Sequence, residues 1–378
     1  MEKIGLYIHI PFCKRKCFYC DFCSYADKLD LQEQYINAVI KELDYVSKNK
    51  EYLVETVYIG GGTPSIINEK LIVQLINSIK QFFKIDDSAE ITIEINPGTA
   101  SEEKINAYKK AGINRASIGL QSASDKLLEE IGRIHNFNEF EKVYSLVQKV
   151  GIDNINVDLM IGLPNQTLDD VEDTLDKIVK KNPSHISVYS LIVEPDTKME
   201  ELISNGTLQL PDEDTERKMY WDVVNKLKNC GYNQYEISNF AKKGFESKHN
   251  VDCWNQKEYI GAGIAAHSYV NGTRYSNICS IEEYIENIEN KNFRKNVIIH
   301  ETQCKESMMK EYMIIGLRKI EGICINDFEK KFQKDPLNVF KNELTKLKKQ
   351  NLIDINKSSI KLTKKGMDFA NIVWEEFV

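Results

Sequence analysis

The sequence has no apolar run of about 18 residues or more, the length that a membrane-spanning helix needs, so no such helix is expected. The opening residues MEKIGLYIHIPFC lack the apolar core and the cleavage site of a signal peptide. An excess of positive charge is also lacking. The net charge of −7 argues against general binding to nucleic acid or to membrane surfaces. Together these absences predict a cytoplasmic protein.

A disulfide framework is not expected either. The chain has nine cysteines, an odd number, and in a reducing compartment they should be free thiols or metal ligands. The 378 residues, 42% hydrophobic and 28% charged, are typical of an ordinary globular protein. This length predicts two domains, or one large domain with an appendage.

Short β-branched runs alternate with amphipathic segments in the first 200 residues. Strands are expected at 4–10, 56–60, 90–96, 115–120, 154–162 and 185–191. Helices are expected at 30–48, 68–84, 101–111, 124–131, 137–150 and 167–181. This alternation predicts an α/β fold with a parallel sheet and helices outside it. Six units would form a partial (β/α)6 barrel, smaller than the closed eight-unit form.

Polar or glycine-rich residues follow strand after strand in this region. The first strand leads into a cysteine-rich loop, and the second leads into Gly60–Thr63. The next three strands deliver Glu94, Gln121 and Asp158. The carboxyl ends of parallel strands meet at one edge, where active sites of such barrels are assembled, so we expect a binding site there.

The pattern changes after residue 200. We expect 201–304, rich in Gly, aromatic and polar residues, to extend the barrel and to face the substrate. Residues 305–378 predict helices and a hairpin, which suggests a small helical, winged-helix-like cap without a basic stripe for nucleic acid. Gly261–Ala266 match G-x-G-x-x-A, but no clear strand precedes them. They predict a tight glycine turn near His267 and not a nicotinamide site.

The cysteines of PFCKRKCFYCDFCSY carry the strongest signal. The spacing Cys13-x3-Cys17-x2-Cys20 offers no second pair for a four-cysteine zinc site and one thiol too many for dithiol exchange. Three thiolates can hold three irons of a [4Fe–4S] cube and leave the fourth iron open. Cys23 is an alternative fourth ligand, although we expect it to be a bystander.

This cysteine spacing, with Tyr19 inside it, resembles that of the radical S-adenosylmethionine (SAM) superfamily. YIHIPFC, GGGTPS, EINPG, SIGLQS, NVDLMIGLPNQT and YEISNFA together resemble the oxygen-independent coproporphyrinogen III oxidase family, and within it the HemW-type branch of haem chaperones. The resemblance covers essentially the whole chain. It implies the partial barrel, a cluster on Cys13, Cys17 and Cys20, and SAM on the open iron.

The resemblance also implies which residues contact SAM. They are Tyr7, Tyr19, Gly61, Gly62, Thr63, Glu94, Gln121, Arg133 and Asp158. The bare backbone of the glycines allows close approach, and Arg133 can donate two parallel hydrogen bonds to the SAM carboxylate. Glu94 and Asp158 are acceptors for hydroxyls or an ammonium group.

The chaperone branch is favoured over the genuine dehydrogenase. That enzyme carries a fourth cysteine where this chain has Phe22, and a longer segment before its cluster motif. The branch typically shows His-Asn-x-x-Tyr-Trp, and here His249 begins a variant with Cys253 in place of tyrosine. His249 is therefore the predicted haem ligand, with Cys253 as an alternative thiolate.

The resemblance implies a protein that binds haem, delivers it to an acceptor haemoprotein and depends on an electron donor for its cluster. One alternative is radical decarboxylation of coproporphyrinogen III propionates to vinyl groups. Another is a different radical reaction on a tetrapyrrole, such as haem breakdown. Whether the protein is an enzyme is left open by the sequence.

Overall fold

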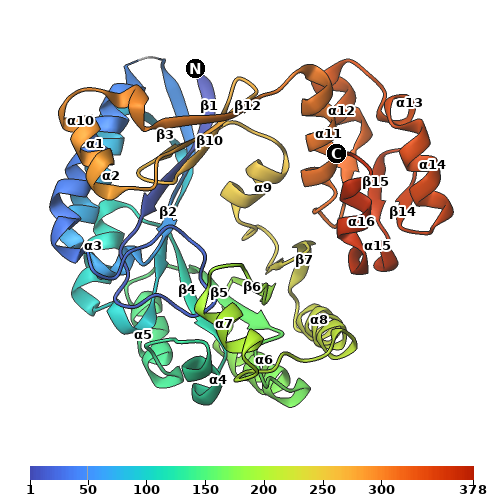
Figure 1. The fold of residues 1–378 in the computed structure, drawn as a ribbon, viewed down its shortest axis with the longest axis horizontal. Coiled ribbons are helices and arrows are strands. Elements are labelled where there is room, and N and C mark those ends of the chain that lie inside the picture. Colours follow the sequence, from blue (N-terminus) through green and yellow to red (C-terminus); the bar gives the residue numbers. More distant parts are fainter. Residues whose placement is uncertain (49) are drawn as a thin grey trace.

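A curved sheet of twelve strands, with helices along its outer side, carries the site, and a separate helical unit follows it (Figure 1). The structure is a computed structural model that describes residues 1–48 and 50–378. Among these residues no helix is long and apolar enough to cross a membrane.

Six parallel strands form the middle of the sheet, in the order of the chain. They are β1 (Glu2–Ile10), β2 (Tyr52–Gly61), β3 (Lys84–Ile95), β4 (Arg115–Gln121), β5 (Asn154–Ile161) and β6 (His185–Ser190). The helices between them are α1 (Gln32–Ser47), α2 (Glu69–Phe82), α3 (Glu102–Ala111), α4 (Asp125–Glu130), α5 (Phe137–Lys149) and α6 (Leu168–Lys181). The predicted α/β fold is confirmed.

Helix α6 shows how local sequence fixes these elements. The Thr167 side chain caps the backbone of Asp170, and the Asp170 side chain accepts from the backbone of Thr167, which forms a capping box. Val171, Leu175 and Ile178, at spacings of four and three, are buried on one face. The helix therefore starts at a defined residue and packs its apolar stripe on the sheet.

Alternation along the strands separates the helix-covered face of the sheet from its inner face. In β3, Ile91, Ile93 and Ile95 belong to the main hydrophobic core. Thr92 and Glu94 alternate with them and face the inside of the curved sheet. The inner face thus carries polar side chains, and it ends in the candidate site.

Segment 201–304 adds strands to both edges of the sheet, which the sequence did not predict. β8 (Asn239–Ala241) pairs with β6, and β7 (Asn233–Glu236) pairs with β8 at the edge of the sheet. At the other edge, β9 (Tyr259–Ala262) pairs in parallel with β1. Beyond β9 follow β10 (His267–Val270), β11 (Thr273–Asn277) and β12 (Val297–Thr302). The helices here are α7 (Lys198–Ser204), α8 (Glu213–Asn229), α9 (Lys248–Trp254) and α10 (Ile281–Glu289).

The glycine-rich segment 261–266 forms the turn that follows β9. The expectation that no strand precedes it is wrong, because β9 leads directly into it. Gly263 has φ +92°, and its N–H donates to the buried Glu42 at 2.8 Å. The Tyr35 hydroxyl accepts from the N–H of Ile264 at 3.0 Å. The turn is therefore fastened to α1 on the barrel.

Residues from 305 on form a unit with its own hydrophobic core. Its helices are α11 (Lys305–Gly316), α12 (Ile325–Phe332), α13 (Pro336–Val339), α14 (Lys341–Lys349), α15 (Lys364–Asp368) and α16 (Ala370–Glu375). β13 (Ile323–Cys324), β14 (Ile353–Ile355) and β15 (Ser359–Leu362) form a small antiparallel sheet, which agrees with the expected winged-helix-like cap. The expected boundaries at 200 and 304 stay predictions.

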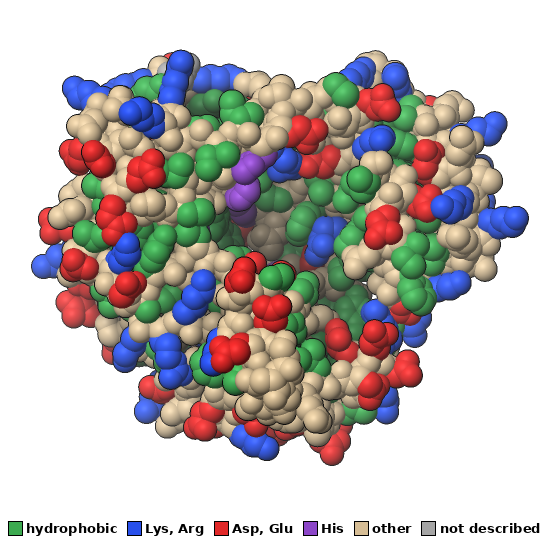
Figure 2. Space-filling view, viewed as in Figure 1, with side chains coloured by type: hydrophobic (Ala, Val, Ile, Leu, Met, Phe, Trp, Pro, Cys, Tyr) green, Lys and Arg blue, Asp and Glu red, His purple; other side chains and the backbone are tan. Residues whose placement is uncertain are grey.

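Arg318 joins this unit to the barrel. Its guanidinium lies 4.5 Å from the Trp254 ring centre and 5.4 Å from that of Trp374. It also pairs at 3.5 Å with Glu236, which is fully buried. Figure 2 shows a hollow at the middle of one face, between the sheet and the C-terminal unit, with positive and negative side chains interspersed around it.

Candidate cofactor site

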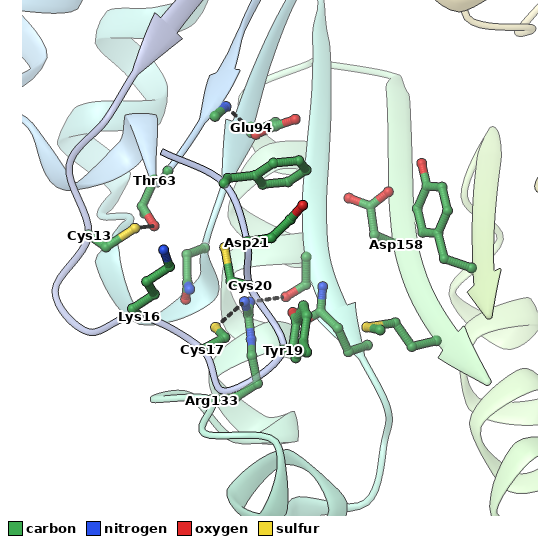
Figure 3. Close-up of a pocket in the computed structure, with 18 of the residues that line it drawn as sticks. Cys13, Lys16, Cys17, Tyr19, Cys20, Asp21, Thr63, Glu94, Arg133 and Asp158 are labelled. Atoms are coloured by element: carbon green, nitrogen blue, oxygen red, sulfur yellow. Dashed lines mark hydrogen bonds between the residues drawn. The ribbon is translucent and has the colours of Figure 1, made fainter. Parts of the chain in front are cut away.

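A cavity of about 450 Å³ opens at the carboxyl ends of the parallel strands. It is lined by most residues that the sequence predicted: Cys13, Cys17, Tyr19, Cys20, Gly61, Gly62, Thr63, Glu94, Gln121, Arg133 and Asp158. Figure 3 shows that the labelled ones come from the cysteine loop, from the ends of neighbouring strands and, for Arg133, from the loop between α4 and α5. The strand-end pattern therefore corresponds to one place in the fold.

The cysteine loop folds back on itself and brings the three thiols to the cavity. The backbone N–H of Cys13 donates to the carbonyl of Tyr25 at 2.9 Å, and that of Cys20 donates to the carbonyl of Cys17 at 3.2 Å. Burial raises the pKa of Cys13, and it raises that of Cys20 to about 11. Without a bound cation these groups are protonated thiols, and metal binding would have to displace their protons.

The three thiols come from one loop on one side of the cavity (Figure 3). Within the described parts of the chain, no three His, Cys, Asp or Glu side chains are grouped tightly enough for a single metal ion. In a cubane cluster each cysteine ligates a different iron, so its ligands need not converge on one point. The donor set of three thiols on one loop therefore fits a [4Fe–4S] cluster.

The glycine loop at the end of β2 is hydrogen-bonded to the backbone of the cysteine loop. The N–H of Gly62 donates to the carbonyl of Ile10 at 2.8 Å, and that of Thr63 donates to the carbonyl of Phe12 at 2.8 Å. A Cβ on Gly62 would lie 2.9 Å from both the Ile10 and the Phe12 oxygens, and 3.1 Å from the Cys13 sulfur. A side chain is thus excluded at this position by the backbone that carries the first cysteine.

Two half-buried carboxylates, Glu94 and Asp158, line the opposite side of the cavity. Glu94 accepts from the Tyr58 hydroxyl at 2.8 Å and from the Gly61 N–H at 3.1 Å. Burial and then the nearby Asp158 raise the pKa of Glu94 to about 7. Asp158 accepts from Ser117 at 2.9 Å, and burial raises its pKa as well. A cationic ligand would favour the ionised forms of both groups.

Arg133 and Gln121 carry buried polar atoms without a partner. Arg133 donates through Nη1 to the Cys17 sulfur at 3.4 Å and through Nη2 to the Gly119 carbonyl at 2.8 Å, which leaves its Nε unpaired. Gln121 adopts φ +68°, and its Oε1 is also unpaired. Unpaired buried polar atoms are costly, so a ligand with polar groups would fit here.

Tyr19 lines the cavity, whereas Tyr7 and His249 do not. Tyr7 lies beside Tyr58, its register partner on β2, with ring centres 6.2 Å apart. His249, on α9, lies 5.3 Å from the same Tyr58 ring. Its Nδ1 is 2.9 Å from Oγ1 of Thr56, and burial lowers its pKa to about 4. Tyr58, which lines the cavity, therefore contacts both predicted residues, whereas they stay outside the lining.

The mouth of the cavity carries residues that the sequence did not single out as site residues. Phe22, Tyr189 and Ile192 line it and are 61%, 40% and 67% exposed. Arg15 and Lys16 line the same cavity. In the sequence, an exposed apolar residue looks the same as a buried one. The search for polar residues at strand ends therefore could not find Phe22, Tyr189 and Ile192.

Comparisons with known proteins agree with this architecture. The model of the radical SAM superfamily matches residues 7–178, and that of the HemN C-terminal domain matches residues 305–369. The "Heme chaperone HemW" of Bacillus subtilis is 38% identical over 98% of this chain and 98% of its own length. The protein of the same name from Lactococcus lactis is 35% identical over 98% of this chain and 96% of its own.

A solved structure shares the whole fold. Coproporphyrinogen III oxidase (HemN) from Escherichia coli superimposes with a TM-score of 0.87 over 100% of this chain and 90% of its own, at 20% sequence identity. At that identity the likeness concerns the fold alone. The family is shown by the full-length relatives and by the superfamily match: the chain belongs to the HemW family of the radical SAM superfamily.

Proposed function

We propose that this protein is a cytoplasmic haem chaperone: it binds haem, transfers it to an acceptor haemoprotein, and carries a [4Fe–4S] cluster with SAM. Two features support this proposal. Relatives that match along almost the whole chain are named haem chaperones. Membership of the radical SAM superfamily implies the cluster and SAM.

The cavity offers a position for each part of these cofactors. Cys13, Cys17 and Cys20 would hold the cluster, which, when bound and reduced by an electron donor, can supply an electron to SAM. Arg133 would donate to the SAM carboxylate, and Glu94 would accept from its cationic or hydroxyl groups.

Five further residues complete this proposed arrangement. Gly62 would allow SAM to approach the backbone, and Gln121 and Asp158 would offer acceptors. Tyr19 would flank the cofactor. Tyr7 would act through Tyr58, against which it stacks.

The mouth of the cavity carries the haem proposal. Haem is a flat apolar macrocycle with two anionic propionates, and an exposed apolar patch beside cations suits such a ligand. Phe22, Tyr189 and Ile192 supply that patch, and Arg15 and Lys16 lie in the same lining for the propionates. Three other surface pockets, which include Ile40, Val73 and Leu146 in their linings, contain none of the exposed large apolar residues of the described chain.

An aspartate at Ile192 tests this position. Ile192→Asp should weaken haem binding, measured from the Soret band in a titration, by roughly 10-fold or more, because a carboxylate would oppose both the apolar ring and the propionates. Ile299→Asp is the matched control, since Ile299 on β12 is 66% exposed and lies outside the cavity lining. Equal loss in both variants would refute a haem site at the mouth.

His249 stays the ligand predicted from the sequence. Its Nδ1 faces Thr56, so Nε2 is the nitrogen that would coordinate iron. His249→Gln keeps a polar group beside Thr56 and removes the imidazole. If His249 ligates haem, the Soret band of bound haem shifts in this variant. An unchanged spectrum, together with a loss in Ile192→Asp, would place haem at the mouth without His249.

Coproporphyrinogen oxidation is the alternative function. The matching fold of HemN allows it, but fold alone does not carry an activity. Anaerobic incubation of the reconstituted protein with SAM, a reductant and coproporphyrinogen III separates the two. Repeated turnover to protoporphyrinogen IX would refute the chaperone proposal, and turnover of haem itself would indicate radical haem breakdown. Stoichiometric haem binding with an intact macrocycle would support the chaperone.

A further inference from the structure

A second pair of thiols lies beside the cluster loop. Cys23 comes three residues after Cys20, and Cys279 lies in the turn between β11 and α10. The Cys23 thiol donates to the carbonyl oxygen of Cys279 at 3.6 Å, which places the two cysteines next to each other. Neither residue lines the cofactor cavity. Two segments that are distant in the sequence therefore bring these two cysteines side by side outside the cofactor site.

Neighbouring contacts hold these two segments in place. The Tyr25 hydroxyl donates to the carbonyl of Cys279 at 3.0 Å, and Lys28 forms an ion pair with Glu282 at the start of α10. Nε2 of His9 lies 2.8 Å from the carbonyl oxygen of Cys23. The position of the Cys23 thiol is thus fixed by the barrel and by the turn, and not by the thiol pair alone.

The geometry points to a redox pair: we propose that Cys23 and Cys279 form a reversible disulfide, and that Cys23 is for this reason not a fourth ligand of the cluster. Both cysteines are free thiols in the structure. Cys279 is exposed and Cys23 is half-buried, so an oxidant in solution reaches Cys279 first. Cytosolic disulfides are typically transient and redox-sensing, which suits a reversible cross-link beside an oxidation-sensitive cluster.

A low-molecular-weight disulfide such as oxidised glutathione balances the reaction. The Cys279 thiolate attacks one glutathione sulfur, which forms a mixed disulfide and releases one glutathione thiolate. The Cys23 thiolate then attacks the Cys279 sulfur, which forms the Cys23–Cys279 bond and releases the second. Two protein thiols are oxidised and one glutathione disulfide is reduced to two thiols.

The same contact explains the order of these steps. Burial, and then the charge of the Cys279 thiolate, raise the pKa of Cys23 to about 11. Once Cys279 carries glutathione, that negative charge is gone and Cys23 loses its proton more easily. The mixed disulfide on Cys279 therefore favours attack by Cys23.

A disulfide here would tie the returning half of the cluster loop to the β11–α10 turn. Tyr25, two residues after Cys23, accepts from the N–H of Cys13 at 2.9 Å, and its own N–H donates to the carbonyl of Pro11 at 2.7 Å. Fixing Cys23 thus restrains the backbone that positions the first cluster ligand. The corner of the cluster that binds SAM stays open, because Cys23 is held elsewhere.

The test uses the cluster-loaded protein under anaerobic conditions. The protein is equilibrated with mixtures of reduced and oxidised glutathione, free thiols are blocked by alkylation, and peptides are mapped by mass spectrometry. We expect a Cys23–Cys279 cross-link whose amount follows the glutathione potential, with unchanged iron content. Cys279→Ser should abolish the cross-link. Cys304→Ser is the control and should leave the cross-link intact. Cys304 is also an exposed thiol, and hydrogen bonds from Ser307 lower its pKa.

Two results would overturn the proposal. One is that no cross-link forms at any potential while Cys304 or the exposed Cys230 becomes glutathionylated. The other is that Cys23 resists alkylation in the cluster-loaded protein and reacts only after the cluster is removed, while Cys23→Ser loses iron. A cysteine that ligates the cluster would behave in this way. Neither result depends on haem binding, so the proposed function is tested separately.

Discussion

Arg133 lies with its Nη1 atom 3.4 Å from the sulfur of Cys17, so the residue expected to bind the SAM carboxylate also touches a predicted cluster ligand. Its Nη2 atom is anchored on the Gly119 carbonyl at 2.8 Å, at the end of β4. The guanidinium is therefore held between a strand end and the cysteine loop, and its side chain borders both proposed cofactors.

This position predicts separate effects of Arg133 on SAM and on iron. Arg133→Ala should weaken SAM binding roughly 10- to 100-fold, the range for losing hydrogen bonds to a charged group, and should leave the iron content unchanged. Arg133→Lys keeps the charge without the planar fork and should fall between. Calorimetry and iron assays on anaerobic protein measure both. Arg294→Ala, at an exposed arginine, is the control. Loss of iron would show instead that Arg133 supports the loop.

Glu94 predicts a pH dependence of SAM affinity. Its pKa is raised to about 7, so the carboxylate forms only as the pH rises through neutrality. SAM carries positive charge, and its affinity should therefore increase from pH 6 to pH 8 beyond the change seen in Glu94→Gln. That variant is the reference because it retains the titration of the ligand itself. Parallel pH profiles of the two proteins would contradict a role for the Glu94 charge.

The same group affects the stability of the cofactor-free protein. Its pKa is 4.5 in an ordinary setting and about 7 in the folded chain, so the folded state binds more protons between these values. The free energy of unfolding should then fall as the pH rises through this window, and it should fall less in Glu94→Gln. Urea denaturation at pH 5 and pH 7.5 measures the difference. A larger fall in the variant would show that the carboxylate is stabilised when charged.

Gly62 predicts a steric effect on cluster loading. Gly62→Ala would place a methyl group 2.9 Å from two carbonyl oxygens of the cysteine loop, and overpacking of this kind costs about 1–3 kcal/mol. We expect a lower iron content after reconstitution. Gly98→Ala is the matched control, because its nearest neighbours would lie at 3.6–3.7 Å. Equal iron content in the two variants would show that the loop can move without losing the cluster.

The parallel sheet could be predicted because its strands and helices carry clear periodicity. The edge strands could not. β9 has four residues, which are too few for a periodic pattern. It pairs with β1, where Gly5 is the partner of Tyr259, more than 250 positions away along the chain. All six residues of β12 are exposed, so no alternation marks it as a strand. Pairings of this kind follow from the tertiary fold and leave no local signal.

The site shows the same division. Glu94, Gln121 and Asp158 were predictable because polar residues at the ends of parallel strands converge at one edge. Tyr7 was expected near them from the resemblance, yet its neighbour Tyr58 on β2 lines the cavity and Tyr7 does not. Which of two neighbouring aromatic side chains borders a cavity depends on packing across strands, and residue order along one strand does not specify it.

Arg318 predicts the strength of the link between the barrel and the C-terminal unit. Arg318→Ala would leave the fully buried Glu236 without its cation and would remove a guanidinium packed between Trp254 and Trp374. Because Arg318 itself is partly exposed, we expect a loss of about 2–4 kcal/mol in the free energy of unfolding, in place of the larger cost of a wholly buried pair. Arg318→Lys should lose less, since it keeps the charge. Denaturant unfolding followed by tryptophan fluorescence measures the loss. Arg294→Ala is the control and should change this free energy by less than about 0.5 kcal/mol. An equally small change in Arg318→Ala would mean that the backbone hydrogen bonds of Ile237 to Arg318 and of Ile320 to Tyr235 hold the two parts together without this side chain.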